Sequence, residues 1–146
     1  MDDTMIRLMQ LGGKGYYCSQ ILMSMALEER GEENPALVRA MAGLAYGCGS
    51  SQASCGALTG GSCVLALYAG KGADDEEQSE LLLSMMQELA DWFAEHVGSE
   101  HGGITCEAIV GEAGPDASRQ TCGSLVGETF NKAMEILAAN DFDPAG

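Results

Sequence analysis

Apolar residues recur every three or four positions along most of this chain, and glycines interrupt the pattern at intervals. This spacing places the apolar side chains on one side of an α-helix. No segment shows the alternation that is typical of a β-strand, and the sequence contains no repeat of fixed period. The pattern therefore predicts an all-α fold in which the glycines lie in the connections between helices.

The length of 146 residues corresponds to one domain with its own hydrophobic core. We expect residues 1–146 to form a single bundle of about six helices, with Gly-rich connections. The acidic run at the start of 74–97 is expected to be the first helical turn, where negative charge is favourable. Residues 47–54, 98–103 and 111–118 are predicted to be loops. The predicted helices cover residues 2–11, 16–30, 35–46, 55–69, 74–97, 105–110 and 121–140.

The charge of the chain limits its partners. Seven Lys and Arg residues face 22 Asp and Glu residues, for a net charge of -15. Such a protein repels phosphate backbones, so we expect no nucleic-acid partner. No apolar run reaches the length that spans a bilayer, and the N-terminus lacks signal-peptide features, so we expect a cytoplasmic protein without membrane insertion. In a reducing cytosol, the six cysteines are better explained as metal ligands or catalytic thiols than as disulfides.

Three of the six cysteines lie in the stretch 46–70, YGCGSSQASCGALTGGSCVLALYAG, which runs from a Gly-rich loop into an apolar helix. Glycine lets the backbone approach a ligand closely because it has no Cβ. A loop that leads into a helix also presents unpaired N–H groups, which favour a thiolate or another anion. We therefore expect Gly56 and Gly60 to contact a cofactor at a cysteine-based redox or metal site.

Cys18, Cys55, Cys106 and Cys122 each fall at or near a predicted helix start. The free N–H groups and the helix dipole at such a position favour thiolate over thiol, so we expect the pKa of these cysteines to be lowered. If the helix starts meet at one end of the bundle, the four thiolates would repel one another. They would then require a metal, a cluster or disulfide formation.

The segment Cys55-Gly56-Ala57-Leu58-Thr59-Gly60 matches the central motif of the C_GCAxxG_C_C family, whose members are described as redox-active. That family has one upstream cysteine, the central motif and two downstream cysteines in a chain of about this length. The resemblance runs over most of the chain and implies a set of four: Cys18, Cys55, Cys106 and Cys122. The chain also resembles the N-terminal module of split-Soret cytochromes, which carries a two-iron cluster.

An iron–sulfur cluster is the first interpretation of these cysteines. Four thiolates suit either a [2Fe-2S] or a [4Fe-4S] cluster, and N–H groups at the helix starts would hydrogen-bond the sulfurs. The expected role is electron transfer with a redox partner protein, or redox sensing. The split-Soret resemblance is also compatible with a homodimer.

Two other functions remain open at this stage. A thiol–disulfide oxidoreductase would use Cys55 as its nucleophile, although the chain has no Cys-x-x-Cys pair. A binding module for a soft metal ion would need no redox turnover. Structural zinc is less favoured, because its ligands usually come in close pairs.

Cys48 and Cys63 lie outside the four-cysteine pattern and are candidate additional ligands. Cys48 lies between two glycines, whereas Cys63 lies inside the apolar predicted helix. With six cysteines available, a larger or second cluster could be held.

Overall fold

The computed structural model describes residues 3–111 and 119–146, and this part of the chain is built from helices. No strand occurs in these ranges; the β-type pairing there is an isolated antiparallel bridge between Ser54 and Thr105. The all-α prediction is therefore confirmed. The elements are α1 (Asp3–Gly13), α2 (Cys18–Arg30), α3 (Pro35–Met41), the 3-10 turn η1 (Ala42–Leu44), α4 (Ala45–Cys48), α5 (Gly56–Ala69), α6 (Leu82–Phe93), the π-helical turn η2 (Ala94–Gly98), α7 (Ser99–His101), α8 (Cys106–Val110) and α10 (Arg119–Ala139).

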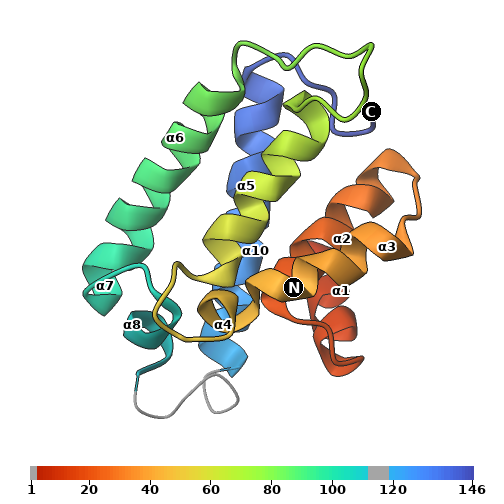
Figure 1. The fold of residues 1–146 in the computed structure, drawn as a ribbon. Coiled ribbons are helices and arrows are strands. Elements are labelled where there is room, and N and C mark those ends of the chain that lie inside the picture. The colour runs from red at the N-terminus through yellow and green to blue at the C-terminus, as the bar shows by residue number, and fades with distance from the viewer. Residues whose placement is uncertain (1–2, 112–118) are drawn as a thin grey trace.

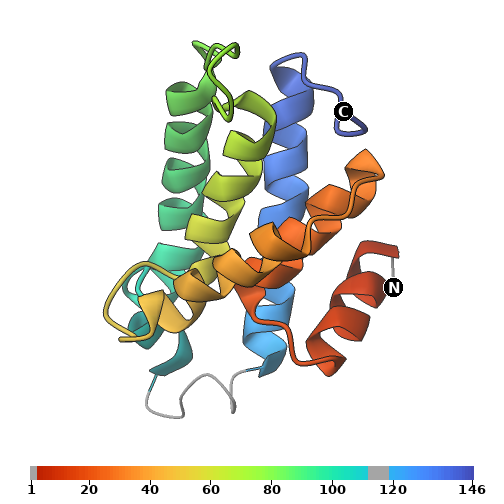
Figure 2. The ribbon, with the colours of Figure 1, turned by 45° about the vertical axis from the view of Figure 1, so that its right-hand side comes forward.

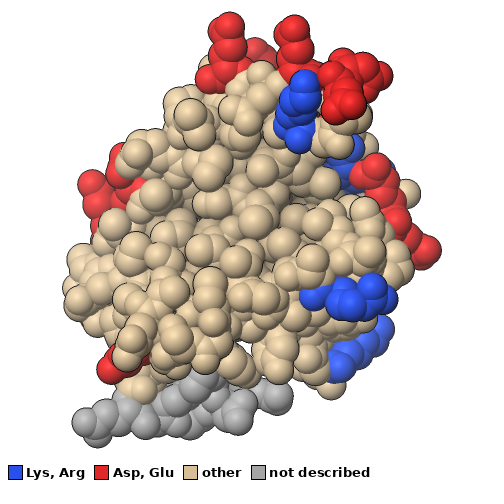
Figure 3. All heavy atoms as spheres, viewed as in Figure 1, with Lys and Arg blue, Asp and Glu red and all other residues tan. Residues whose placement is uncertain are grey.

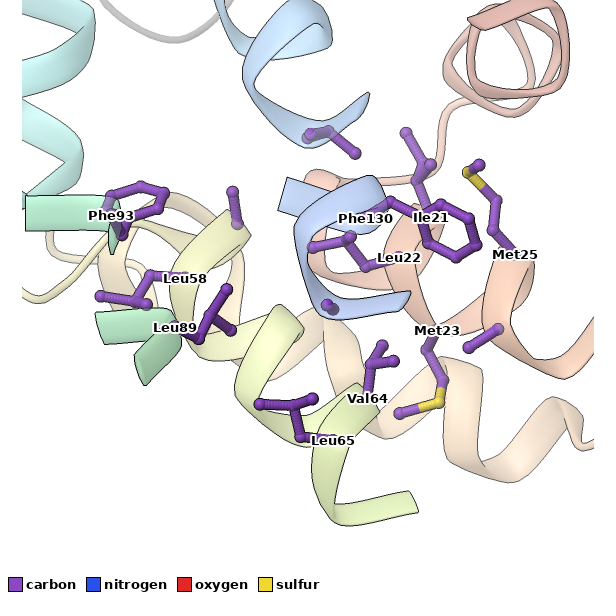
Figure 4. Packing of buried hydrophobic residues seen from close by; sticks show 14 of the residues in the cluster. Ile21, Leu22, Met23, Met25, Leu58, Val64, Leu65, Leu89, Phe93 and Phe130 are labelled. Carbon is purple, nitrogen blue, oxygen red and sulfur yellow. The ribbon is translucent and has the colours of Figure 1, made fainter. Parts of the chain in front are cut away.

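Helix α5 lies at the centre of the bundle. It packs against α2, α6 and α10, and Figures 1 and 2 show it with α6 on one side and α2 on the other. Val64 and Leu65 of α5 are fully buried. Figure 4 shows side chains from α2, α5, α6 and α10 filling the space between these helices. The apolar periodicity of the sequence therefore corresponds to the packed core.

A glycine pair allows α5 to approach its neighbours closely. A Cβ at Gly60 would lie 3.0 Å from the Cα of Ser19 in α2. A Cβ at Gly61 would lie 3.0 Å from side-chain atoms of both Leu89 and Thr129. Ser19 and Thr129 are fully buried, and their hydroxyls donate to the carbonyl oxygens of Met41 and Leu125. The absence of a side chain at Gly60 therefore sets the distance between α5 and α2.

The acidic run at residues 74–77 does not begin a helix, so that prediction is wrong; α6 begins at Leu82. The run folds back on itself instead. The N–H of Gly72 donates to Glu76 Oε1 at 2.6 Å, and the N–H of Ser79 donates to the carbonyl of Ala69 at 2.8 Å. These bonds hold the connection against the end of α5. A carboxylate that accepts from a local N–H competes with helix formation.

Two other predicted boundaries differ from the structure. The predicted helix 35–46 stops being α-helical at Met41, continues as the 3-10 turn η1 and then reverses its handedness in α4. The predicted break at residue 98 is not a break. The chain passes through η2 and α7 and turns at Gly102, which has a left-handed φ of 77°. The predicted loop 111–118 lies, beyond its first residue, outside the described residues.

The surface is strongly acidic in places and neutral in others. Figure 3 shows acidic side chains gathered at one end of the molecule, over the connection between α5 and α6. The Lys and Arg side chains lie along one edge of the same view, and most of the face between them is neutral. Within the described ranges, no helix combines the length and the apolar character that crossing a membrane requires.

Candidate functional site

Four of the six cysteines line one cavity of about 730 Å³. Cys18 is the first residue of α2, and Cys106 is the first residue of α8. Cys55 immediately precedes α5, and Cys122 lies in the first turn of α10. In Figures 1 and 2 the surrounding elements α4, α8 and the start of α10 gather at the lower end of the bundle. The helix starts that the sequence indicated therefore converge around a common space.

Backbone hydrogen bonds join the segments that carry Cys55 and Cys106. The N–H of Cys55 donates to the carbonyl of Ile104 at 2.7 Å, and the N–H of Cys106 donates to the carbonyl of Ala53 at 3.2 Å. The bridge between Ser54 and Thr105 lies between these two bonds. This short pairing holds the start of α5 and the start of α8 together.

Local caps then fix the first turn at each of these two cysteines. Cys55 is the N-cap residue of α5, and its Sγ accepts from the N–H of Ala57 at 3.4 Å. Before α8, the hydroxyl of Thr105 accepts from the N–H of Ala108 at 3.0 Å. These contacts satisfy helix-start donors that would otherwise lack a partner.

Gly56 keeps space free for the sulfur of Cys18. A Cβ at this position would lie 2.7 Å from Cys18 Sγ and 3.0 Å from the carbonyl oxygen of Leu44. Because atoms do not approach this closely, any larger residue at position 56 would displace the sulfur or the backbone. The sequence predicted that Gly56 contacts a cofactor; the group that lies against it in the structure is the thiol of Cys18.

A left-handed turn in α4 forms another part of the cavity wall. Tyr46, Gly47, Cys48 and Gly49 have φ values of 55°, 63°, 58° and 83°. This conformation costs roughly 1–2 kcal/mol for each residue other than glycine. It places Tyr46 on the cavity wall, where its ring packs edge-on against Tyr17 at 5.1 Å between centroids. A Cβ at Gly47 would lie 3.2 Å from the Cβ of Cys106.

Burial raises the pKa of all four cavity thiols, so the expected lowering is wrong for the described structure. Loss of solvation, with a smaller contribution from the charge of Cys55, raises the pKa of Cys18 to about 12. Loss of solvation also raises the pKa of Cys55 to about 11 and raises the pKa of Cys106 and Cys122. The helix-start N–H groups of Ser19 and Ala57 act in the opposite direction, but their effect is smaller. The cost of burying a charged thiolate therefore outweighs the stabilisation that the helix-start N–H groups give it.

The four thiols lie close enough for each to affect the ionisation of the others. The six pairs among Cys18, Cys55, Cys106 and Cys122 all interact in this way. In each pair, a negative charge on one thiol raises the pKa of the other. Among the described residues, no three His, Cys, Asp or Glu side chains are gathered tightly enough to hold one metal ion. What the four thiols share is the cavity that they line.

The rest of the cavity wall is neutral. No Lys, Arg, His, Asp or Glu side chain lines it among the described residues. Its polar groups are the thiols, Ser124 and three tyrosines, and its apolar groups come from α1, α2, α8 and α10. Helix α1 was not part of the predicted site because it has no cysteine. No signal in the sequence indicates that its methionines face the thiols.

The remaining predicted site residues lie elsewhere. Cys48 is exposed at the end of the left-handed turn, and Cys63 is half-buried in α5, where it packs against the core. Neither lines the cavity. Gly60 contacts α2, as described above, and does not line the cavity either.

Comparison with protein-family models gives a match over residues 16–136, to the family described as "Putative redox-active protein (C_GCAxxG_C_C)". The matched region contains all six cysteines and extends from the residue before Tyr17 almost to the end of α10. Comparisons with curated proteins and with solved structures gave no match.

Proposed function

Since this chain belongs to the C_GCAxxG_C_C family of redox-active proteins, we propose that Cys18, Cys55, Cys106 and Cys122 hold an iron–sulfur cluster in the cavity. The protein then serves in electron transfer or redox sensing. The observation that carries this proposal is the convergence of these four cysteines, from four separate helices, on one cavity.

The donor set fits a cluster better than a single ion. In a tetrahedral zinc site all four sulfurs bind one atom at about 2.3 Å, so they lie close to one another. In a cluster each thiolate binds one iron of a larger core, so the sulfurs lie farther apart. The described thiols come from four separate elements and line a cavity with room for a multi-atom core. This arrangement supports the multi-atom alternative.

The raised thiol pKa values are compatible with ligation by iron. A buried thiol stays protonated when nothing compensates its charge, and a bound cation removes the proton by supplying that compensation. The N–H groups of Ser19, Ala57 and Leu58 already interact with Cys18 and Cys55 in the direction that favours thiolate. They would hydrogen-bond the ligating sulfurs.

A bound cluster would take up and release one electron at a time. The chain supplies its surroundings: buried thiolate ligands, a few N–H donors, and a wall without cationic side chains among the described residues. Because no cationic side chain of the described lining residues offsets the negative charge of the thiolates, this part of the wall would favour the oxidised state of a bound cluster and hence a low reduction potential. The iron content per chain distinguishes a two-iron cluster from a four-iron cluster.

Electron exchange with a partner protein would use the rim of the cavity. Tyr16 and Tyr17 line the cavity and are each 40% exposed, so a partner could reach the wall at this point. A redox partner protein that docks here is part of the proposal.

The raised pKa of Cys55 favours a cluster over the thiol–disulfide alternative. That alternative required a Cys55 thiolate at neutral pH, whereas burial raises the pKa of Cys55 to about 11. A binding module for a soft metal ion would use the same four thiols to hold that ion. The metal and sulfide content measured below distinguishes such a protein from a cluster protein.

The experiment is a set of single Cys→Ser variants purified without oxygen, with iron and acid-labile sulfide measured per chain. Serine at position 18, 55, 106 or 122 should remove most of the iron and the visible absorption. Serine at position 48 or 63 is the matched control and should leave both unchanged, because these residues lie outside the cavity. Equal iron loss in all six variants, or metal without sulfide in the wild-type protein, would contradict the proposal.

A further inference from the structure

The cavity is larger than an iron–sulfur cluster needs. An eight-atom iron–sulfur core fills about the space of five water molecules, roughly 150 Å³ at ~30 Å³ each. The cavity measures about 730 Å³, within the range of roughly 300–1,000 Å³ that is typical of small-molecule sites. A cluster at the four thiols would therefore leave most of the space open.

Helix α1 forms the wall of this additional space. It contributes Met5, Leu8 and Met9 and contains no cysteine. Glycines on α10 allow α1 to pack closely there: a Cβ at Gly127 would lie 2.8 Å from Met5 Sδ, and a Cβ at Gly123 would lie 3.7 Å from Leu8 Cδ2. The cavity therefore extends from the thiols to a methionine-lined surface that is held against α10.

The chemistry of the wall selects the ligand. The described lining residues include no ionised side chain, so they offer a charged ligand no counter-charge in exchange for the hydration that it would lose. Tyr16, Tyr17 and Tyr46 offer aromatic surfaces, and the methionines offer thioethers, which make favourable contacts with aromatic rings. An uncharged planar ring system is the ligand class that these groups match.

We propose that the methionine- and tyrosine-lined part of the cavity binds a small, uncharged, aromatic molecule beside the thiols. The inference rests on the proposed function only in that the cluster takes the thiol end of the cavity. A molecule bound there would be in position to contact that cluster.

The test compares two probes of the same shape, using full-length protein purified without oxygen. 2-Naphthol is uncharged at pH 7, whereas 2-naphthoate carries a negative charge on the same rings. Equilibrium dialysis should show that 2-naphthol binds at least tenfold more tightly than 2-naphthoate. Equal binding of both probes, or no binding of either at millimolar concentration, would overturn the proposal.

Variants then locate the bound probe. Met9 and Ser124 line the cavity from opposite helices, and both are exposed, so Met9→Trp and Ser124→Trp should fill the space without disturbing the core. Ile6 lies on α1, is 44% exposed and does not line the cavity, so Ile6→Trp is the control. We expect at least tenfold weaker 2-naphthol binding in the first two variants and unchanged binding in the control. If all three variants bind like the wild-type protein, the site lies elsewhere and the proposal fails.

Iron is measured on the same samples, which separates the two proposals. Probe binding that follows the expected pattern in protein without iron or sulfide would contradict the cluster alone. Stoichiometric iron and sulfide without selective probe binding would contradict the aromatic site alone.

Discussion

Gly56 is the single residue on which the position of the Cys18 sulfur depends most directly. Its missing side chain leaves room for that sulfur at the start of α5, and a Cβ would lie only 2.7 Å from it. The sequence identified Gly56 through the glycine-rich motif. It could not show that the neighbour is Cys18, because the two residues come from different helices.

Gly56→Ala should therefore lower the iron content per chain by at least half and change the visible spectrum. The added methyl group would displace the sulfur of Cys18 or the carbonyl of Leu44. Gly43→Ala is the control, because a Cβ there would have no atom within 4 Å. Circular dichroism should show the same helix content in both variants. Wild-type iron content in Gly56→Ala would contradict this account of the position.

The raised pKa values of the buried thiols also predict how pH affects the apoprotein. Cys18 and Cys55 have pKa values of about 12 and about 11 in the folded chain, above the ordinary value of a free thiol. At pH values between the ordinary and the raised value, the unfolded chain has lost protons that the folded chain keeps. Unfolding then becomes easier as the pH rises.

We therefore expect the melting temperature of the apoprotein to fall as the pH rises from about 9 to 11. Replacing Cys18 and Cys55 by Ala should make that part of the profile shallower, because the thiols whose pKa values rise to about 12 and about 11 are then absent. Thermal unfolding monitored by circular dichroism measures this directly. A profile of equal slope in the wild-type protein and in this variant would show that the two thiols do not carry the effect.

At the scale of elements, the sequence predicted the first residue of α3 correctly. Helix α3 begins at Pro35 with Asn34 as its N-cap, whose side chain accepts from the N–H of Leu37. The acidic run before α6 gave the wrong start. The residues that tie it down, Gly72 and Ser79, bond to a side chain and to the end of α5. Such contacts form only in the folded chain, so no periodic pattern in the sequence predicts them.

The packing of α5 on α2 gives the prediction at this scale. Gly60→Ala should lower the free energy of unfolding by about 1–3 kcal/mol, because the new methyl group meets the backbone of α2 at 3.0 Å. Gly12 lies in α1, and a Cβ at this position would have no atom within 4 Å, so Gly12→Ala is the matched control. It should be neutral or stabilising by up to about 1 kcal/mol. Denaturant titration of both variants provides the comparison, and equal stability would mean that α5 and α2 do not need this glycine.

At the scale of the whole molecule, the all-α class could be predicted from periodicity alone, whereas the cavity could not. The predicted helix starts at residues 16, 55 and 105 lie within two residues of the observed starts of α2, α5 and α8. Their convergence depends on the backbone pairing of residues 53–55 with 104–106 and on the close packing of α1 against α10. These contacts join distant segments through main-chain atoms and small residues, which carry no recognisable pattern in one sequence.

The arrangement of the molecule keeps the proposed redox centre apart from its acidic end. The acidic connection between α5 and α6 lies at the opposite end of the bundle from α8 and the start of α10 (Figures 1 and 3). The cysteine-lined cavity has a neutral wall among the described residues. Among the described residues, the side chains next to the thiols are therefore neutral, whereas acidic side chains gather at the other end.

The most direct test of the cluster is the iron and acid-labile sulfide content of wild-type protein purified without oxygen, together with its visible spectrum. We predict a coloured protein with two or four irons per chain, an equal amount of sulfide, and absorption that bleaches on reduction. A colourless protein with six titratable thiols and neither iron nor sulfide would contradict the central claim.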